Sequence, residues 1–345
     1  MTGDEGFGDE GFRYEDWSVA GWRTHLPGVT GVRDFAAGLG DEAIPALAAA
    51  AAARVPDRVA VTVDGEPVTH AGLDDAAGRV AAWLAKRVRP GDRVLLAAAA
   101  SVGFVRCYLG ALRAGAVVVL ANPGYTAAEL GHLIADSGAV LAFADREPAR
   151  RLAGLGPDST LVVVDVREMP GDAGPATAVA ARPRDTALLA YTSGTTGRPK
   201  GVPLTHRQVA VSIRAAMAAW RWHAADVLVV QRQRVHQHVG GTVHIRSKFS
   251  PADLVQAAGD TRASVLFGVP TVYQALLQSP AALGGGLRDL RLAVCGSAPL
   301  SPAAGRPCSG GCRWSGTARR RAGWTSPTRS AIPGGTPSAC RCPAC

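Results

Sequence analysis

Residues 188–202 of the sequence read LLAYTSGTTGRPKGV, and this stretch decides the fold. The apolar run Ala187 to Ala190 is typical of the end of a buried strand. It is followed by six small residues that carry four hydroxyl groups, namely Thr192, Ser193, Gly194, Thr195, Thr196 and Gly197. Glycines let the backbone turn several N–H groups toward one point, hydroxyls add hydrogen-bond donors, and Lys200 adds a positive charge. The stretch therefore predicts a loop that binds a polyphosphate.

The loop differs from a Walker A loop, because Lys200 is followed by Gly201 rather than Ser or Thr and the glycine spacing is different. An ordinary loop rich in Gly, Ser and Thr is the alternative that the composition alone favours. The order Thr-Ser-Gly-Thr-Thr-Gly-x-Pro-Lys-Gly after a strand is far more specific than that composition. We therefore prefer phosphate binding.

The stretch resembles, at nearly every position, the phosphate-binding signature of the adenylate-forming (AMP-binding) superfamily, and within it the acyl-CoA synthetases. The resemblance implies an α/β fold, a large N-terminal domain with layered, mostly parallel sheets and helices. It also implies that ATP and a carboxylate form an acyl-adenylate, with Mg²⁺ accompanying the nucleotide, and that coenzyme A then takes the acyl group. On this resemblance Thr192 and Lys200 are the expected catalytic residues, and residues 192–197 with Lys200 surround the phosphates.

The composition is that of a globular, loop-rich protein. The chain has 345 residues, of which 47% are hydrophobic, with 41 Gly and 23 Pro. The N-terminus MTGDEGFGDEGF is acidic and has no apolar core of a secretory signal, and no apolar run reaches the length of a membrane span. We expect a cytoplasmic protein that does not bind a membrane.

The net charge of +9 comes mostly from the end of the chain. Residues 303–345 contain seven arginines and no acidic residue, so removing them leaves +2 for residues 1–302. The basic balance therefore does not predict nucleic-acid binding by the main body. We expect small-molecule partners, a carboxylate and a nucleotide, and the sequence does not indicate the oligomeric state.

Apolar patterns from residue 44 onward alternate between helix and strand, which predicts βαβ units and a largely parallel sheet. We expect helices at 44–55, 73–88, 103–114, 127–137 and 205–222, and strands at 59–63, 68–69, 94–98, 116–120, 139–143 and 160–166. Asp64-Gly65 is typical of a hairpin turn. The stretches RPGDRVLL and LRAGAVVVLANPGYTAAEL also resemble the family, and we interpret them as scaffold.

Two further stretches resemble the family's substrate-binding region. SVLFGVPTVYQALL (264–277) resembles the strand, turn and helix that wall the acyl site, which assigns Gly268, Val269, Pro270 and Tyr273 to an acyl pocket. RLAVCGSAPL (291–300) resembles the strand and loop beside the adenine, here Gly296, Ser297, Ala298 and Pro299. Cys295 is interpreted as a small buried hydrophobe rather than a nucleophile. The nearest subfamily by resemblance is a malonyl- or short-chain acyl-CoA synthetase.

The histidines support weaker hypotheses. His236 and His238 keep a His-x-His spacing seen near the acyl pocket of relatives, but the preceding residues are polar, so we regard residues 230–245 as damaged and keep His236 as a pocket residue. A metal site on His236, His238 and His244 lacks further ligands, and we predict no metal. His206, in the first turn of a helix, either faces solvent or favours an anion. Trp220 and Trp222 are interpreted as core.

The end of the chain does not continue the family pattern. Residues 303–345 contain no Leu, Val, Lys, Asp or Glu, and they lack the Tyr-Gly-x-Thr-Glu loop, the ribose-binding Asp and the small C-terminal domain with its lysine. Five cysteines there could form a zinc module, but their spacing does not match a paired Cys-x2-Cys site. A basic disordered arm is a second possibility.

A shift of reading frame near Pro302 explains more about residues 303–345 than the zinc module or the disordered arm does. Relatives carry Leu-Pro-Leu-Pro-Gly-Val, which can be written CTG CCG CTG CCC GGC GTG. Read one nucleotide later, with C following, these codons give Cys-Arg-Cys-Pro-Ala-Cys, the sequence of residues 340–345. We therefore divide the chain into an irregular leader (1–40), a partial AMP-binding domain (41–302) and an unstructured tail (303–345). The expected function is acyl-CoA ligation, with a catalytically inactive, truncated relative as the alternative.

Overall fold

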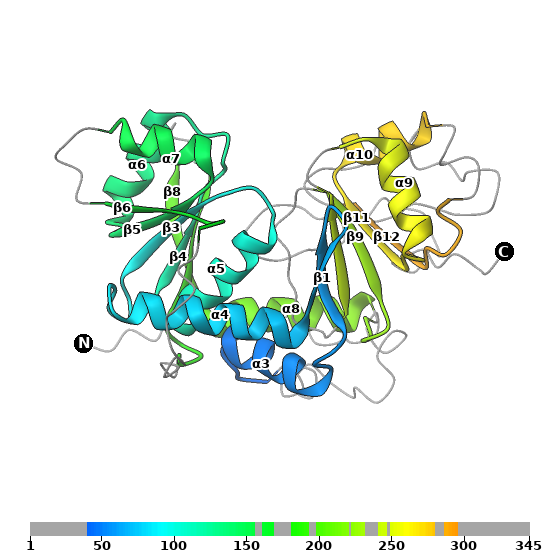
Figure 1. Cartoon of the computed structure of the whole chain (residues 1–345), viewed down its shortest axis with the longest axis horizontal. Coiled ribbons are helices and arrows are strands. Elements are labelled where there is room, and N and C mark those ends of the chain that lie inside the picture. Colours follow the sequence, from blue (N-terminus) through cyan, green and yellow to red (C-terminus); the bar gives the residue numbers. More distant parts are fainter. Residues whose placement is uncertain are drawn as a thin grey trace, which may run out of the picture.

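The computed structural model describes residues 40–155, 161–168, 181–192, 198–220, 222–231, 241–246, 249–279 and 286–295. These residues form two six-stranded sheets with helices between them and on their outer faces (Figure 1). This mixed α/β architecture with two mostly parallel sheets confirms the predicted fold class. None of the helices in these ranges is long and apolar enough to cross a membrane.

Sheet A has the strand order β12-β11-β9-β10-β1-β2. Its strands are β1 (Val59–Val63), β2 (Glu66–Thr69), β9 (Val227–Gln231), β10 (Thr242–Arg246), β11 (Val265–Gly268) and β12 (Leu292–Cys295). All neighbours are parallel except β1 and β2, which form a hairpin. Asp64 and Gly65 both have positive φ, 48° and 99°, as the predicted Asp-Gly hairpin turn requires.

Sheet B has the order β6-β5-β3-β4-β7-β8. Its strands are β3 (Arg93–Ala97), β4 (Val117–Leu120), β5 (Leu141–Ala144), β6 (Val162–Asp165), β7 (Thr186–Thr192) and β8 (Lys200–Thr205). Here too every neighbouring pair is parallel except the last, because β7 and β8 form an antiparallel hairpin. The phosphate signature connects these two strands.

The helices fill three layers around the sheets. They are α3 (Ile44–Arg54), α4 (His70–Ala85), α5 (Val102–Arg113), α6 (Ala127–Ser137), α7 (Arg146–Ala153), α8 (His206–Trp220), α9 (Pro251–Asp260) and α10 (Pro270–Leu277). In Figure 1, α4, α5 and α8 lie between the sheets, α6 and α7 cover the outer face of sheet B, and α9 and α10 cover that of sheet A. The order is helix, sheet, helix, sheet, helix.

The core follows from side-chain alternation along the strands. In β3, Val94 and Leu96 point into the central cluster shared with α4 and α5, whereas Leu95 and Ala97 point into the outer cluster with α6 and α7. Strands buried on both faces are continuous apolar runs, and this explains the Val- and Leu-rich segments of the sequence. Trp220 and Trp222 pack against the central cluster, as predicted.

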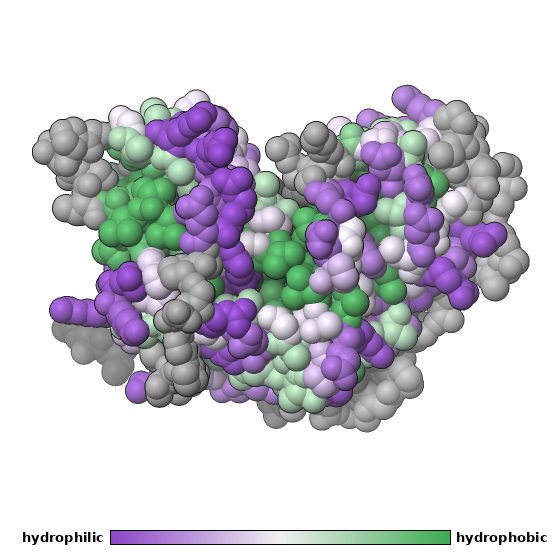
Figure 2. All heavy atoms as spheres, viewed as in Figure 1, coloured by the Kyte–Doolittle hydropathy of each residue, from purple (hydrophilic) through white to green (hydrophobic). Residues whose placement is uncertain are grey.

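One apolar surface remains at the edge of sheet B. Figure 2 shows apolar side chains gathered over the β5 and β6 region at the left of the molecule. Val162 of β6 is 51% exposed, and Val140, which precedes β5, is 42% exposed. The segments 156–160 and 169–180, which flank β6 in the chain, lie outside the described ranges, as do residues 1–39 of the predicted leader (1–40) and the predicted tail (303–345).

Candidate active site

The phosphate signature lies at the closed end of the β7–β8 hairpin. The register pairs Thr192 with Lys200, so the two ends of the signature are held face to face by the strand ladder. Residues 193–197, which include the predicted phosphate contacts Ser193, Gly194, Thr195, Thr196 and Gly197, lie outside the described residues. The sequence patterns did not predict β8, since they assign no strand between the signature loop and the helix expected from residue 205. The central part of the signature therefore connects the two strands of an antiparallel hairpin.

Lys200 and Thr192, the two predicted catalytic residues, are both exposed where the structure describes them. No described carboxylate lies within ion-pair distance of the Lys200 ammonium. Thr192 ends β7, at the carboxyl edge of a largely parallel sheet, which is the usual position of ligands in open α/β sheets. An ammonium and a hydroxyl thus face solvent at the two ends of a short, donor-rich loop, and this arrangement suits a phosphate.

The remaining predicted site segments gather at the carboxyl edge of sheet A. Three neighbouring strands, β12, β11 and β9, end there. β12 leads into the predicted adenine residues 296–299, β11 into Val269 and Pro270, and β9 into the segment containing His236. Residues 296–299 and His236 lie outside the described ranges, but the topology brings the starts of all three segments together.

Gly268 ends β11, and Pro270 begins α10 with Val269 as the N-cap residue. A Cβ at Gly268 would lie 3.1 Å from Cγ1 of Val272 and 3.3 Å from Cε2 of Tyr273, so the helix packs closely on this turn. The predicted strand, turn and helix of this stretch are confirmed. Their assignment to an acyl pocket stays a prediction.

Tyr273 is only 1% exposed. Its hydroxyl lies 2.6 Å from the carbonyl of Val294 in β12 and 3.1 Å from that of Leu266 in β11, so it links two neighbouring strands. Burial raises the pKa of this hydroxyl well above its ordinary value, which keeps it protonated and able to donate. Tyr273 therefore braces β11 against β12, and its assignment to an acyl pocket stays a prediction.

Cys295 lies at the end of β12 and is 3% exposed. Burial raises the pKa of its thiol to about 11, so the thiolate needed for nucleophilic chemistry is scarce at neutral pH. The interpretation of Cys295 as a small buried hydrophobe is confirmed by its position in the cluster between sheet A and α9–α10.

His206 corrects one expectation, because its side chain is buried rather than facing solvent. It is 1% exposed, and burial lowers its pKa while the charge of Asp185 opposes that effect. Five residue steps of strand separate Thr205, the neighbour of His206, from Lys200 along the ladder, about 17 Å at the rise of a strand. His206 therefore lies at the opposite end of the hairpin and cannot contact an anion bound by the signature loop.

The metal hypothesis gains no support from the described residues. Among them, no group of three or more His, Cys, Asp or Glu side chains could hold a metal ion. His244 lies within β10, where burial and then the charge of Arg246 lower its pKa. His236 and His238 lie outside the described ranges.

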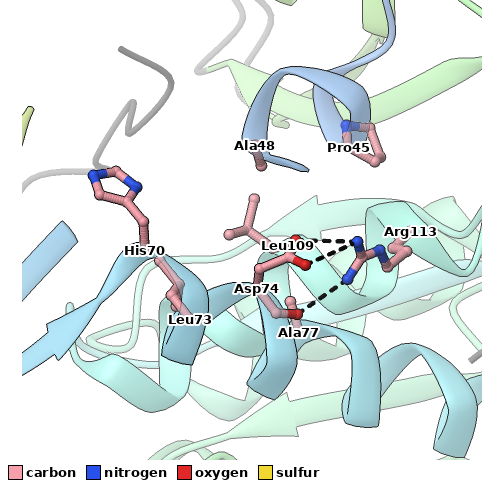
Figure 3. Close-up of a pocket in the computed structure, with 8 residues that line it drawn as sticks. All are labelled: Pro45, Ala48, His70, Leu73, Asp74, Ala77, Leu109 and Arg113. Carbon is pink, nitrogen blue, oxygen red and sulfur yellow. Dashed lines mark hydrogen bonds and ion pairs between the residues drawn. The ribbon is translucent and has the colours of Figure 1, made fainter. Parts of the chain in front are cut away.

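A small cavity lies between α3, α4 and α5, lined by His70, Asp74 and Arg113 among others (Figure 3). Its volume of about 20 Å³ has room for roughly one water molecule. His70 lies 3.3 Å from the carbonyl of Gly241, which directly precedes β10, so the cavity is near the amino ends of the strands of sheet A. It is therefore separate from the carboxyl edges that carry the predicted site.

One face of α6 contacts both arms of the signature hairpin, and the sequence patterns did not predict this. The hydroxyl of Tyr191 donates to Oδ2 of Asp136 at 2.6 Å, and Nε2 of His132 lies 3.0 Å from the carbonyl oxygen of Pro199. These contacts join residues 55 and 67 positions apart, so no local pattern could have revealed them.

Comparison with known proteins places these features in a family. A family model described as "AMP-binding enzyme" matches residues 48–313. The chain is 35% identical over 260 residues to a feruloyl-CoA synthase from an Amycolatopsis species, covering 71% of this chain and 52% of that protein. It is 31% identical over 258 residues to an oxalate–CoA ligase from Arabidopsis thaliana, covering 66% and 50%.

Solved structures agree with the fold. ATP-bound MatB from Rhodopseudomonas palustris superposes with a TM-score of 0.66 at 30% identity, over 76% of this chain and 56% of that one. VinN superposes with a TM-score of 0.68 at 25% identity, over 76% of this chain and 70% of that one. The chain spans about half the length of the curated relatives it matches.

Proposed function

Because the chain belongs to the AMP-binding enzyme family, we propose that it activates a carboxylic acid with ATP and passes the acyl group to coenzyme A. In the first step a carboxylate oxygen attacks the α-phosphorus of ATP. The bond from that phosphorus to the bridging oxygen breaks, and the products are an acyl-adenylate and pyrophosphate. In the second step the sulfur of coenzyme A attacks the acyl carbon, its proton is lost, and AMP leaves as a thioester forms.

The observation that carries this proposal is the position of the signature. A Gly- and hydroxyl-rich loop closes an antiparallel hairpin whose first strand ends at the carboxyl edge of sheet B, and Lys200 faces solvent beside it. Negative charge on the β- and γ-phosphates is best stabilised by fixed donors and a cation. The loop residues 192–197 with Lys200 are therefore proposed to hold pyrophosphate as it leaves.

The other half of the nucleotide and the acyl group are assigned to sheet A. Gly296, Ser297, Ala298 and Pro299 would border the adenine, and small residues there would let a flat base approach the backbone closely. Gly268, Val269 and Pro270 would wall the acyl group, together with His236, and Tyr273 would brace that wall. The relatives named as feruloyl- and oxalate-CoA enzymes motivate an aromatic acid and a dicarboxylic acid as test substrates.

Mg²⁺ enters the proposal only as part of the nucleotide substrate. The described residues offer no metal-binding cluster of their own, and Mg²⁺ in such sites is commonly held through the substrate phosphates. We therefore assign no protein ligand to it and no step that depends on one.

An ATP–pyrophosphate exchange assay tests the first step without requiring coenzyme A. The full chain would be incubated with ATP, labelled pyrophosphate and, one at a time, ferulate, oxalate, malonate and a short-chain fatty acid. The proposal predicts exchange above background with at least one acid. Lys200→Ala should reduce exchange by roughly 10²-fold, the scale observed when one charge-stabilising donor is removed.

Lys86→Ala is the matched control, because Lys86 is an exposed lysine at the end of α4, away from the hairpin. Its exchange rate should stay at the wild-type level. Equal losses in both variants would mean that Lys200 has no specific role. If the chain catalyses exchange but forms no thioester when coenzyme A is added, the first proposed step stands and the second is wrong.

The alternative is a catalytically inactive relative that at most binds nucleotide. It is favoured by residues 303–345, which contain seven arginines but no Leu, Val, Lys, Asp or Glu. No exchange with any acid, together with no ATP-dependent change in the thermal unfolding midpoint, would support it. Sequencing the gene from codon 225 to codon 345 tests the proposed frame shift, which requires that a one-base correction near codon 302 restore family-like sequence.

A further inference from the structure

The signature hairpin has one weakly supported arm. Among the described strands, β8 lies at the edge of sheet B and has a strand neighbour on one side only, β7. Its residues Val202 and Pro203 are exposed, and Pro203 has no N–H to donate to the ladder. An edge strand with Gly201 and Pro203 within it opens easily. The ladder pairs Lys200, the first residue of β8, with Thr192, and contacts outside the ladder would hold this pairing more firmly.

α6 supplies those contacts from two residues one helical turn apart. His132 and Asp136 are separated by four positions and therefore lie on the same face of the helix. Asp136 accepts a hydrogen bond of 2.6 Å from the hydroxyl of Tyr191, the residue before Thr192 in β7. Nε2 of His132 lies 3.0 Å from the carbonyl oxygen of Pro199, the residue before Lys200. The two arms of the hairpin are thus both held at the base of the signature loop.

The chemistry of these two bonds is unambiguous. A carbonyl oxygen can only accept, so Nε2 of His132 carries a proton and donates to Pro199. Burial, and after it the hydrogen bond to Asp136, raises the pKa of the Tyr191 hydroxyl, which therefore remains a donor. The His132 ring also meets the Tyr191 ring edge-on, with 6.4 Å between the ring centroids, a separation within the range of about 4.5–7 Å found for aromatic pairs. The three side chains form one contact set.

The helix that carries this contact set is itself firmly held. Thr126 and Glu129 form a capping box at its start, and Gly138 ends it in the left-handed conformation with φ of 63°. Leu130 and Leu133 are buried in the outer cluster against sheet B. Nε of Arg93 in β3 donates to the carbonyl of Ser137 at 2.7 Å. These contacts hold α6 firmly against sheet B, so its side chains can in turn hold the hairpin in place.

We propose that His132 and Asp136 are positioning residues for Lys200. They hold the base of the signature loop through Pro199 and Tyr191, and so keep Lys200 where it can bind a phosphate of ATP. This inference rests on the proposed function of the loop in ATP binding. Groups that are already held in place before a ligand arrives lose less conformational freedom on binding, and Lys200 is such a group in this proposal. Removing the contacts should therefore weaken ATP binding, although neither His132 nor Asp136 touches the nucleotide in this proposal.

The test uses the full chain and two measurements. His132→Leu, Tyr191→Phe and their combination remove the donors, and His132→Gln keeps a donor that can reach the position of Nε2. Glu147→Gln is the control, because it breaks the exposed Arg150–Glu147 pair of α7, away from the hairpin. Hydrogen–deuterium exchange of peptides spanning residues 186–205, without ligand, reports on the hairpin. Calorimetric titration with Mg-ATP reports on the nucleotide.

The double variant should show amide exchange at least fivefold faster near residues 191–201, with protection unchanged in β3 and β5. Its dissociation constant for ATP should rise roughly tenfold, equivalent to the loss of a single good hydrogen bond. His132→Gln and Glu147→Gln should stay close to the wild type in both measurements.

Three results would overturn the inference. They are unchanged exchange at the hairpin in a folded double variant, faster exchange with unaltered ATP affinity, and equal effects in His132→Gln and His132→Leu. If the wild-type chain binds no ATP, the proposed function fails. In that case the positioning role fails together with the proposed function. Hydrogen exchange still tests separately whether the contacts of His132 and Asp136 stabilise the hairpin.

Discussion

Arg291 donates from Nε to Oδ1 of Asp226 at 2.8 Å, and this pair joins the starts of strands that are far apart in the sequence. Asp226 directly precedes β9, Arg291 precedes β12, and Ser264, which donates to Oδ1 of Asp226 at 2.6 Å, precedes β11 between them. Asp226 is 4% exposed. The same three strands carry the predicted adenine and acyl segments at their other ends, so this network aligns the strands that present the site.

Replacing Arg291 by Met should destabilise the chain strongly, because it leaves the buried Asp226 carboxylate without its cation. Burial alone would raise the pKa of Asp226, but hydrogen bonds from Arg291, Ser264 and the His223 N–H outweigh burial and hold the pKa below its ordinary value of 3.8. Breaking a buried pair by removing one partner costs about 3–5 kcal/mol. Since Arg291 is partly exposed, we expect about 3 kcal/mol, measured by urea unfolding at pH 7.

Arg262→Met is the control for this prediction. Arg262 faces Asp289 at 3.9 Å with a side chain that is 84% exposed, and such surface pairs contribute about 0–1 kcal/mol. A loss in Arg291→Met no larger than that in Arg262→Met would show that the Asp226 network does not hold the strands together.

Two glycines on neighbouring helices should respond to alanine in opposite ways. A Cβ at Gly110 of α5 would lie 2.4 Å from Cβ of Val80 and 2.9 Å from the carbonyl of Ala77, both in α4, so the two helices would have to separate. Overpacking of this kind costs typically about 1–3 kcal/mol. At Gly78 of α4 the nearest atom is the flexible end of Arg113, at 3.4 Å, and alanine there should stabilise by about 0.5–1 kcal/mol.

Thermal unfolding of both variants checks this pair. Gly110→Ala should lower the unfolding midpoint, and Gly78→Ala should raise or preserve it. If both changes move the midpoint in the same direction, the close approach of α4 and α5 is not what requires glycine at position 110.

The sequence patterns predicted the elements well where periodicity and end signals agree. The predicted ranges of β1 and α6 match the structure at both ends, because a Val-rich run bounded by a turn and a Thr-capped helix ended by glycine are strong local signals. β8 was missed because Gly201 and Pro203 depress its strand propensity. Pro203 is tolerated because β8 is an edge strand, which local reasoning cannot know.

The helix α7 was also missed, because its local sequence signals are weak. Its sequence REPARRLA has few apolar residues, and its N-cap residue Asp145 makes no capping bond. Instead, Oδ2 of Asp145 accepts from the N–H of Ala99, beyond the end of β3. The burial of His206 and the α6 contacts to the hairpin likewise depend on tertiary neighbours, so only the structure could place them. The predicted adenine residues remain predictions, since they follow the last described residue of β12.

Cys107 and Cys295, the two cysteines within the described ranges, are buried and should resist alkylation while the chain is folded. Burial raises the pKa of Cys107 to about 12 and that of Cys295 to about 11, and the thiolate is the reactive form. Iodoacetamide at pH 8 followed by site-resolved mass spectrometry should leave both peptides unmodified, and urea should make both reactive. Rapid native labelling of Cys295 would mean that the end of β12 is open.

Stability should fall below about pH 6.5, and His206 should account for part of the fall. Its pKa is lowered in the folded state, chiefly by burial, from an ordinary value of 6.5, so the unfolded chain binds its proton more readily. The contribution of neutral His206 is complete above pH 6.5 and is lost as the pH falls toward the lowered folded pKa. The slope for one such group is at most about 1.4 kcal/mol per pH unit.

His206→Phe should flatten this decline, because it removes the titrating group and the Nδ1 atom that finds no hydrogen-bond partner among the described residues. His244, whose pKa is also lowered, should account for a second share, so the double variant His206→Phe/His244→Val should be flatter still. Urea unfolding from pH 5 to pH 8 measures these slopes. A wild-type slope that His206→Phe leaves unchanged would show that His206 is already protonated, or readily accommodated when protonated, in the folded chain.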